Sequence, residues 1–271
     1  MPELPEVETT RRGIAAAMTG DCIAAVVVRE PRLRWRLPGE FAAQLRGQSI
    51  RAVRRRAKYL LIDLERGCLI VHLGMSGSLR VLPAMTIALK HDHVDLILNS
   101  GACLRFNDPR RFGSMHYTTE APEQHALLRK LAPEPLENDF NAAYLAAKAK
   151  RRKVAMKQFV MNGNLVVGVG NIYASEALFR AGIRPSRRAG RVKKAEFAKL
   201  VKAIKTVLSA AIRSGGTTLR DYVNAEGTPG YFRQKLFVYD RKGQPCRKCG
   251  TAIRQIAQGQ RSTYYCPTCQ T

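Results

Sequence analysis

The pattern of apolar and polar positions changes character along the chain. Residues 1 to about 118 predict one short helix followed by many short strands with turn residues between them. Arg66-Gly67 and Asn99-Ser100-Gly101 have the composition of hairpin turns. Short antiparallel strands at this spacing predict a β-sandwich. The apolar runs that predict the strands are Ile23–Arg29, Tyr59–Leu64, Leu69–Leu73, Val94–Leu98 and Ala102–Phe106.

The start of the chain predicts the short helix. Pro5 suits the first helical position, because the N–H that proline lacks has no partner there. Glu6 and Glu8 then lie near the positive end of the helix dipole, and Arg11 and Arg12 lie further along. This order of charges is the one that the dipole favours.

A helical period replaces the strand pattern in the second half of the chain. Apolar residues recur on one face across Lys193–Arg213, and Gly215-Gly216 ends this helix. Residues 214–234 are rich in glycine and predict a mobile loop. The apolar stripe consists of Phe197, Leu200, Val201, Ile204, Val207, Leu208 and Ala211.

A change of composition divides the chain. Prolines and acidic residues cluster at Ala121–Pro135 and mark a hinge. We therefore predict an α+β protein with a β-sandwich domain at residues 1–120, a linker at 121–136, a helical domain at 137–235 and a C-terminal hairpin at 236–271.

The 271 residues suffice for one large domain or two ordinary ones. No apolar run approaches the roughly 18 residues that a membrane span needs. The segment MPELPEVETT carries acids where a secretory signal has a basic region followed by an apolar one. We expect a soluble, intracellular protein with no membrane partner.

The charge of the chain points to a polyanionic partner. There are 46 Lys and Arg residues against 21 Asp and Glu residues, which gives a net charge of +25. Basic clusters occur at Arg51–Lys58, Lys148–Lys157 and Arg184–Lys194. Nucleic acid is the usual partner of such a surface, because each neutralised phosphate releases counterions. Composition leaves open a merely solubilising surface and does not separate RNA from DNA.

The seven cysteines fall into two groups. Cys22, Cys68 and Cys103 have apolar neighbours, as small buried hydrophobic residues do. The other four form two C-x2-C pairs with sixteen residues between them, a spacing typical of a hairpin folded around tetrahedral zinc. Disulfides are the alternative, which an intracellular location disfavours. We predict one structural Zn²⁺ held by Cys246, Cys249, Cys266 and Cys269.

The second residue is a candidate nucleophile. Removal of Met1 would leave Pro2 with a free secondary amine. An α-amino group titrates at roughly 7.7–8.0, so part of it is unprotonated at neutral pH. Such an amine attacks electrophilic carbon, and Glu3 and Glu6 are near enough in sequence to move protons. The alternative is an ordinary helix start.

Segments along the whole chain resemble one enzyme family. In order and register, the chain is similar to bacterial formamidopyrimidine-DNA glycosylases, which excise oxidised purines from DNA. The segments that carry the resemblance are MPELPEVETTRRG, RRAKYLL, HLGMSGSLR, HDHVDL, DPRRFG, GVGNIYASE, GGTTLRDY, PGYF and QRSTYYCPTCQ.

The resemblance implies a set of catalytic residues. Pro2 matches the nucleophile that attacks C1′ of the damaged nucleotide, Glu3 a proton-transfer group and Glu6 a supporting carboxylate. Lys58 and Arg261 match catalytic residues that contact phosphates around the lesion. The implied enzyme is both a glycosylase and an abasic-site lyase, which cleaves the strand by successive β- and δ-elimination.

The resemblance also implies contacts with DNA. Asn171 resembles an N-cap that binds phosphate in a helix–two-turn–helix element, and Lys157 matches a lysine near the damaged base. His72 and His91 are carried over as DNA contacts. From the residues alone, His72 is equally well a core histidine. We reject a metal site at His91 and His93, because this spacing makes a poor mononuclear site.

Met75, Arg110 and Phe112 match residues that fill the gap left by a flipped-out base. Without the resemblance, these side chains are expected to fold back on the core. Arg220, Tyr222 and Tyr231 fall in a segment that corresponds to a loop closing on the flipped base.

Some positions depart from the family pattern. Phe159 replaces a more usual Trp or Leu, and residues 161–164 lack an expected acid or glutamine. The departures affect the details of base contact and leave the reaction unchanged.

Two rivals to this hypothesis have different substrates or none. An endonuclease VIII-like enzyme shares the proline, the glutamate and the zinc but prefers oxidised pyrimidines. A non-catalytic zinc-ribbon protein shares the charge and the zinc alone. For the preferred hypothesis we expect a monomer that acts on double-stranded DNA with oxidised bases or abasic sites, in the cytoplasm and associated with the nucleoid.

Overall fold

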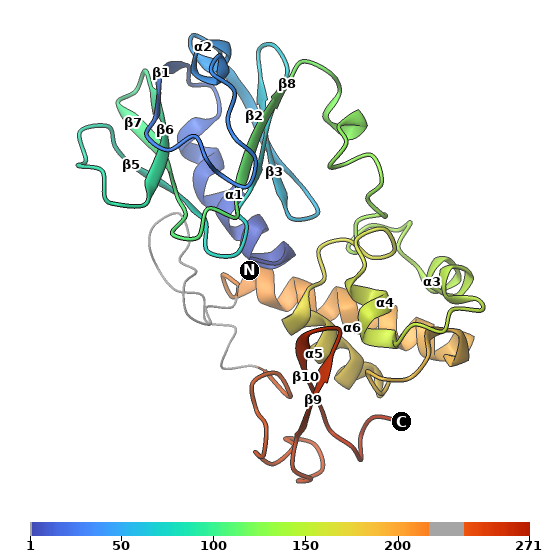
Figure 1. Ribbon diagram of the computed structural model, residues 1–271. Coiled ribbons are helices and arrows are strands. Elements are labelled where there is room, and N and C mark those ends of the chain that lie inside the picture. Colours follow the sequence, from blue (N-terminus) through green and yellow to red (C-terminus); the bar gives the residue numbers. More distant parts are fainter. Residues whose placement is uncertain (1, 217–235) are drawn as a thin grey trace. The chain divides into compact units, whose positions relative to one another are not determined.

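A computed structural model describes residues 2–216 and 236–271 (Figure 1). These residues form two compact units. The first comprises residues 2–129 with 214–216, and the second comprises residues 130–213 with 236–271. The division lies inside the predicted linker, and the predicted helical and hairpin segments belong to one unit.

The first unit is built on two four-stranded antiparallel sheets. The first sheet has the order β1 (Ile23–Val28), β6 (Asp92–Leu98), β7 (Ala102–Asn107), β5 (Ser78–Pro83). The second sheet has the order β2 (Ile50–Arg56), β3 (Tyr59–Leu64), β4 (Cys68–His72), β8 (Ser114–Thr118). The predicted β-sandwich is confirmed.

The strands that the sequence pattern found are those with long apolar runs. β1, β3, β4, β6 and β7 coincide with the predicted runs to within two residues at each end. β2, β5 and β8 were not predicted. β2 reads IRAVRRR and buries only Ile50 and Val53, which a register irregularity between Ile50 and Ala52 brings onto the same face of the strand.

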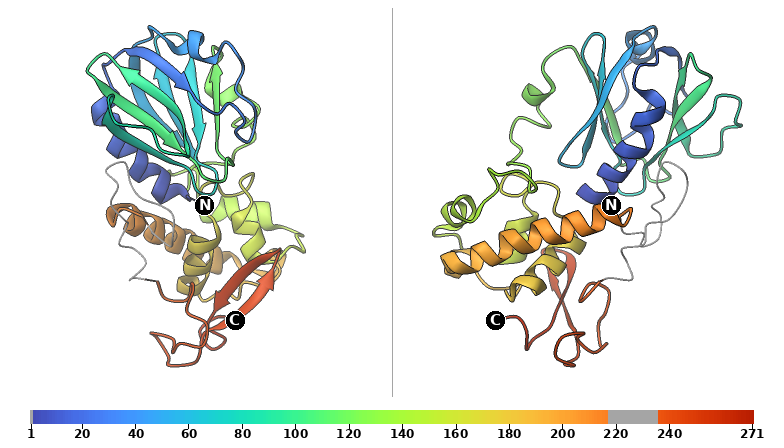
Figure 2. Two further views of the ribbon diagram at one scale, coloured as in Figure 1. Left: turned by 60° about the vertical axis from the view of Figure 1, so that its left-hand side comes forward. Right: turned by 180° about the vertical axis from the view of Figure 1, so that it is seen from behind.

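One hydrophobic core fills the first unit. Side chains of both sheets, among them Leu60 and Phe106, contact side chains of helix α1 (Leu4–Met18), which runs along the sandwich (Figure 2). Cys68 and Cys103 are buried as predicted, and burial raises the pKa of Cys68 to about 12. Cys22 is only partly buried, contrary to the prediction.

Helix α1 begins at Leu4. Glu3 is its N-cap and Pro5 occupies the second helical position, one later than predicted. The position still tolerates proline, because the first N–H groups of a helix have no intrahelical acceptor. The short helices α2 (Phe41–Leu45) and η1 (Pro122–Gln124) complete the first unit.

The second unit is helical with a C-terminal hairpin. Its longest helix, α6 (Lys194–Arg213), has the predicted apolar stripe, with Ala203 buried and Val201 only partly so. The hairpin pairs β9 (Arg254–Gln258) with β10 (Arg261–Tyr265) in antiparallel register. The elements are α3 (Ala142–Ala149), α4 (Met156–Met161), α5 (Asn171–Ala181), η2 (Ala189–Arg191), α6, β9 (Arg254–Gln258) and β10 (Arg261–Tyr265).

In the part of the chain that the structure describes, no helix combines the length and the apolar composition that crossing a membrane requires.

Candidate active site and nucleic-acid interface

Two carboxylates are buried at the start of α1. Glu3 is 3% exposed and Glu6 is 2% exposed, and the Glu3 backbone N–H donates to Oε2 of Glu6 at 2.8 Å. Pro2, directly before them, is also buried. The sequence dictates this geometry, because a glutamate at the third helical position reaches back to the N-cap. A candidate nucleophile and two candidate proton carriers therefore lie together at the positive end of a helix.

Gly216 packs against this group. A Cβ atom at Gly216 would lie 3.2 Å from Cγ and Oε1 of Glu6, and the residue has a φ of +84°. Both the space and the backbone conformation favour glycine here. Gly216 thus helps to enclose the carboxylate of Glu6.

Lys58 lies in a tight turn. β2 and β3 are joined by Ala57 and Lys58 alone, and Ala57 has a φ of +54°. Arg55 donates to the carbonyl oxygen of Ala57 at 3.0 Å and to Oε2 of Glu8 at 3.3 Å. Although burial raises the pKa of Glu8, hydrogen bonds from Arg11 and Arg12 bring it below the ordinary value. An ionised Glu8 therefore links α1 to the turn that carries Lys58.

His72 is the neighbour of this turn across β3 and β4. Its ring lies 4.9 Å from that of Tyr59, its partner in the strand register. Burial, with the charges of Lys58 and Arg34, lowers the pKa of His72 to about 4. Its Nδ1 accepts a hydrogen bond from the N–H of Gly74 at 3.0 Å, so the single ring proton of the neutral form is on Nε2. His72 is a neutral donor at pH 7.

The three residues predicted to fill a gap in DNA are all exposed. Met75 is 41% exposed and Phe112 is 44% exposed, which excludes side chains folded back on the core. Arg110 lies over the ring of Phe112, with Cζ 4.8 Å from the ring centre. Arg110 also lines two surface hollows, of about 630 Å³ and 540 Å³.

His91 and His93 have different environments. Nε2 of His93 is hydrogen-bonded to the carbonyl oxygen of Asp108 at 2.8 Å, and His93 is buried. His91 is only partly buried, which leaves part of its surface for a DNA contact. Within residues 2–216 and 236–271, the one group of three or more potential metal ligands is formed by cysteines, so neither histidine belongs to such a group.

Asn171 lies at the start of α5, but the prediction that it is the N-cap is wrong. Gly170 is the N-cap and Asn171 is the first helical residue. Nδ2 of Asn171 donates to the hydroxyl of Tyr239 at 3.2 Å, and its Oδ1 is buried without a hydrogen-bond partner. With the amide turned by 180°, the two atoms change places and the Tyr239 hydroxyl donates to Oδ1.

Lys157 is enclosed in the protein. It is 1% exposed, and its Nζ donates to the carbonyl oxygen of Ser262 at 2.9 Å and to Oγ1 of Thr263 at 2.8 Å. This placement does not support the predicted contact with the damaged base. Instead, Lys157 ties α4 to β10, whose first residue is the exposed Arg261.

Glu176 is a structural residue that the sequence analysis missed. Its buried carboxylate accepts three backbone N–H groups, from Phe237, Val238 and Tyr239, each at 2.9 Å. Burial raises its pKa, and these three hydrogen bonds act in the opposite direction. Glu176 thereby fixes Tyr239 beside Asn171. About sixty residues separate the partners, so no local pattern signals this contact.

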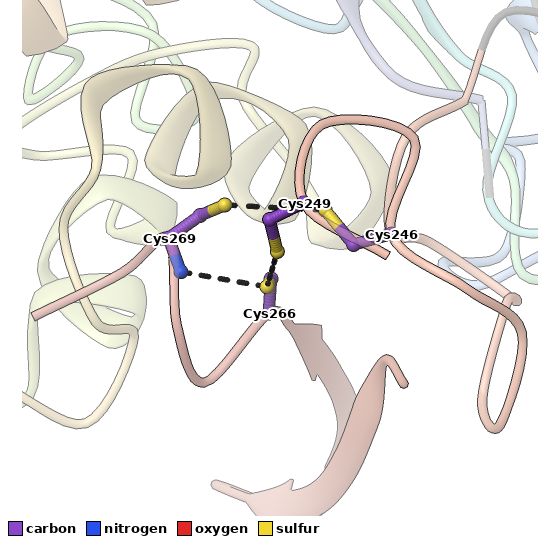
Figure 3. Close-up of side chains that lie close together, drawn as sticks. All are labelled: Cys246, Cys249, Cys266 and Cys269. Carbon is purple, nitrogen blue, oxygen red and sulfur yellow. Dashed lines mark hydrogen bonds between the residues drawn. The ribbon is translucent and has the colours of Figure 1, made fainter. Parts of the chain in front are cut away.

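The four predicted zinc ligands converge (Figure 3). Their ligand atoms all lie within 4.8 Å of one another, with Sγ atoms 4.0 Å apart for Cys246 and Cys269 and 3.5 Å apart for Cys249 and Cys266. Tetrahedral zinc with Zn–S bonds of about 2.3 Å places sulfurs about 3.8 Å apart, whereas a disulfide needs about 2.05 Å. The residues fit one Zn²⁺, and four thiolates leave no open position for a reactant. The zinc is structural.

These observations define a class of protein. The chain has a β-sandwich unit with buried carboxylates at its first helix, and a helical unit with a closed four-cysteine hairpin. With a net charge of +25, these features indicate a zinc-containing nucleic-acid-binding protein.

Family models narrow the class. Residues 1–115 match the formamidopyrimidine-DNA glycosylase N-terminal domain, residues 131–223 match the H2TH domain of the same glycosylase, and residues 243–271 match the zinc finger found in FPG and IleRS. The chain belongs to the formamidopyrimidine-DNA glycosylase family, as the sequence resemblance predicted.

Relatives support this assignment over the full length. Proteins named formamidopyrimidine-DNA glycosylase from Thioalkalivibrio sulfidiphilus and Methylococcus capsulatus are 58% and 56% identical over 270 residues, covering 100% of both chains in each case. The crystal structure of the MutM (FPG) protein of Thermus thermophilus is 39% identical with a TM-score of 0.89, covering 99% of this chain and 98% of that chain. A complex of a Lactococcus lactis FPG mutant with Fapy-dG containing DNA is 31% identical with a TM-score of 0.93, covering 100% of both.

The predicted lesion-loop residues Arg220, Tyr222 and Tyr231 lie outside the described residues.

Proposed function

We propose that the protein is a bifunctional DNA glycosylase and abasic-site lyase that excises oxidised purines from double-stranded DNA in base excision repair. The observation that carries this proposal is the group of Pro2, Glu3 and Glu6 at the start of α1. An amine next to two enclosed carboxylates is suited to attack on a sugar carbon followed by proton transfer.

The reaction proceeds from the amine of Pro2, once Met1 is removed. The nitrogen attacks C1′ as the bond to the base breaks, and the base leaves with the electron pair and takes up a proton. Ring opening gives an iminium between Pro2 and C1′, with Glu3 moving the proton at the sugar. The iminium acidifies C2′, so loss of a C2′ proton expels the 3′-phosphate. A second elimination expels the 5′-phosphate, and water then releases the enzyme.

Four residues are proposed to hold the phosphates around the lesion. Lys58 offers a charge from the β2–β3 turn, and His72 offers a neutral Nε2–H beside it. Asn171 offers its amide at the start of α5, and Arg261 offers an exposed guanidinium at the start of β10. Helix starts and arginines are common phosphate-binding elements in DNA-binding proteins.

Met75, Arg110 and Phe112 are proposed to enter the duplex when the damaged nucleotide is flipped out. Their exposure and their position on short loops support this role. An unbranched side chain and an aromatic ring wedge between bases, and arginine bonds the unpaired partner base. His91 is proposed as a further DNA contact.

Trapping tests the proposed chemistry. Borohydride reduces an iminium to a stable amine, so it should link the protein covalently to DNA containing 8-oxoguanine opposite cytosine. A non-catalytic zinc-ribbon protein would bind the same DNA, with salt-dependent affinity, and give no adduct with any lesion or abasic site.

Oxidised pyrimidines are the second candidate substrate class. A Lactococcus lactis FPG that is 31% identical to this chain, with a TM-score of 0.92, was crystallised with DNA containing an oxidized pyrimidine. Parallel excision assays on 8-oxoguanine opposite cytosine and thymine glycol opposite adenine separate the two candidates. We expect the purine to be preferred, and faster release of thymine glycol would reverse the assignment.

We further propose that the protein acts as a monomer in the cytoplasm, associated with the nucleoid. The charge of +25 supports association with DNA at large, because the contacts with phosphate are independent of sequence.

A further inference from the structure

The loops that carry Met75 and the Arg110–Phe112 pair are neighbours by topology. One loop leaves β4 and enters β5, and the other leaves β7 and enters β8. His72 pairs with Ser114 in one sheet, and Ser78 pairs with Asn107 in the other. Both loops therefore cross between the same two pairs of adjacent strands and must run side by side.

The backbones of the two loops are in close contact. A Cβ atom at Gly74 would lie 2.4 Å from the carbonyl carbon of Phe112 and from the nitrogen of Gly113. Gly74 also has a φ of +65°. No other residue type fits this crossing without displacing the loop that carries Phe112.

The buried carboxylate of Asp108 accepts hydrogen bonds from both loops. Asp108 is 0% exposed, and its Oδ1 accepts from Oγ of Ser76 at 2.6 Å. Within its own loop, Oδ1 accepts from the N–H of Arg110 at 3.2 Å and Oδ2 accepts from the N–H of Gly113 at 2.8 Å. The carboxylate thus brackets Arg110 and Phe112 and reaches across to the residue next to Met75.

The Asp108 main chain is fixed as well. Its N–H donates to the carbonyl oxygen of His91 at 3.0 Å, and its own carbonyl oxygen accepts from the N–H of Arg111 and is bonded to Nε2 of His93. Arg111 has a φ of +55°, so the turn between the two wedge residues is strained and needs such support.

We infer that Asp108 and Ser76 are positioning residues that join the two loops into one rigid wedge. The inference rests on the proposed function, since it concerns how Met75, Arg110 and Phe112 enter the duplex. A wedge that is ordered before binding loses little conformational entropy on insertion, whereas two independent loops must be ordered by the DNA. Asp108 and Ser76 themselves touch no reacting atom.

Ser76→Ala tests the link between the loops with the least disturbance. We expect the single-turnover excision rate on duplex DNA with 8-oxoguanine to fall about tenfold, because a hydrogen bond to a charged group is lost. Cleavage of a single-stranded oligonucleotide with an abasic site needs no wedge, and its rate should be unchanged. Ser76→Thr retains the hydroxyl and should restore the duplex rate.

Ser114→Ala is the matched control. Ser114 is buried like Ser76, lies beside the same loops and has a hydroxyl without a hydrogen-bond partner. Its replacement should leave the ratio of duplex to single-stranded rates unchanged. In a Met75→Ala background, Ser76→Ala should cause little further loss, since both changes disable the same loop.

The inference is overturned if Ser76→Ala leaves the ratio unchanged, lowers both rates equally, or has the same effect as Ser114→Ala. If the parent protein cleaves neither substrate, the proposed function fails. Amide hydrogen exchange then still decides on the loops, because Ser76→Ala should speed exchange at Arg110 and Gly113, and unchanged exchange refutes the link.

Discussion

The environment of His72 can be tested by lowering the pH and comparing the stability of the parent protein with that of a His72→Asn variant. Asparagine retains an acceptor near the position of Nδ1 for the N–H of Gly74 but does not titrate. Burial and two neighbouring cations hold the pKa of His72 at about 4, against 6.5 for the free side chain. At 1.36 kcal/mol per pKa unit, this difference in pKa corresponds to about 3 kcal/mol in the free energy of unfolding.

The sign follows from which state takes up the proton first. Below pH 6.5 the unfolded chain protonates His72, while the folded protein resists protonation until pH 4. The stability that neutral His72 contributes to the folded protein is therefore complete above pH 6.5 and is lost as the pH falls towards 4. Acid should destabilise the parent protein more than His72→Asn, by about 3 kcal/mol between pH 7 and pH 4.

Urea unfolding at a series of pH values provides the assay, with the fluorescence of Trp35 as the signal. Trp35 is the one tryptophan of the chain and lies in the same unit as His72. The zinc ligands and other acid-sensitive groups are common to both proteins, so the difference isolates His72. Parallel loss of stability in the two proteins, or a midpoint near 6.5 for His72 in an NMR titration, would show that the surroundings of His72 do not disfavour its protonation.

Lys58→Met should reduce the magnitude of the slope of log K against log salt for DNA binding by about 0.9, whereas His72→Asn should leave it unchanged because the imidazole is neutral; equal reductions contradict this. Lys157→Met should lower the free energy of unfolding by about 1–3 kcal/mol, measured by calorimetry, because the partners of its ammonium on β10 are left unsatisfied; an unchanged value would show that the contact contributes nothing. Cys249→Ser should reduce the zinc content by mass spectrometry and weaken DNA binding through Arg261, and unchanged affinity would show that the hairpin is dispensable.

The sequence predicted those parts of the fold that depend on local composition. Apolar runs identified β3 and β4, and the stripe on α6 identified a long amphipathic helix. The two C-x2-C pairs predicted the cysteine cluster, because the chemistry of zinc fixes both the residue type and the spacing. β2 was not predicted, because it buries only two positions and arginines occupy most of the others.

Non-local hydrogen bonds could not be predicted in this way. The carboxylate of Glu176 accepts hydrogen bonds from the backbone of residues 237–239, and that of Asp108 accepts one from Ser76 on another loop. The sequence resemblance suggested that Lys157 contacts DNA, but its ammonium donates hydrogen bonds to Ser262 and Thr263, more than a hundred residues away. Which partner a polar side chain finds depends on the tertiary fold, so only the structure shows it.

Peptide mapping of the borohydride-trapped adduct identifies the nucleophile, on which the proposed reaction depends. We expect the sugar remnant to be attached to a peptide that begins with Pro2 and lacks Met1. A remnant on a lysine side chain, or Met1 still attached in fully active protein, would contradict this expectation.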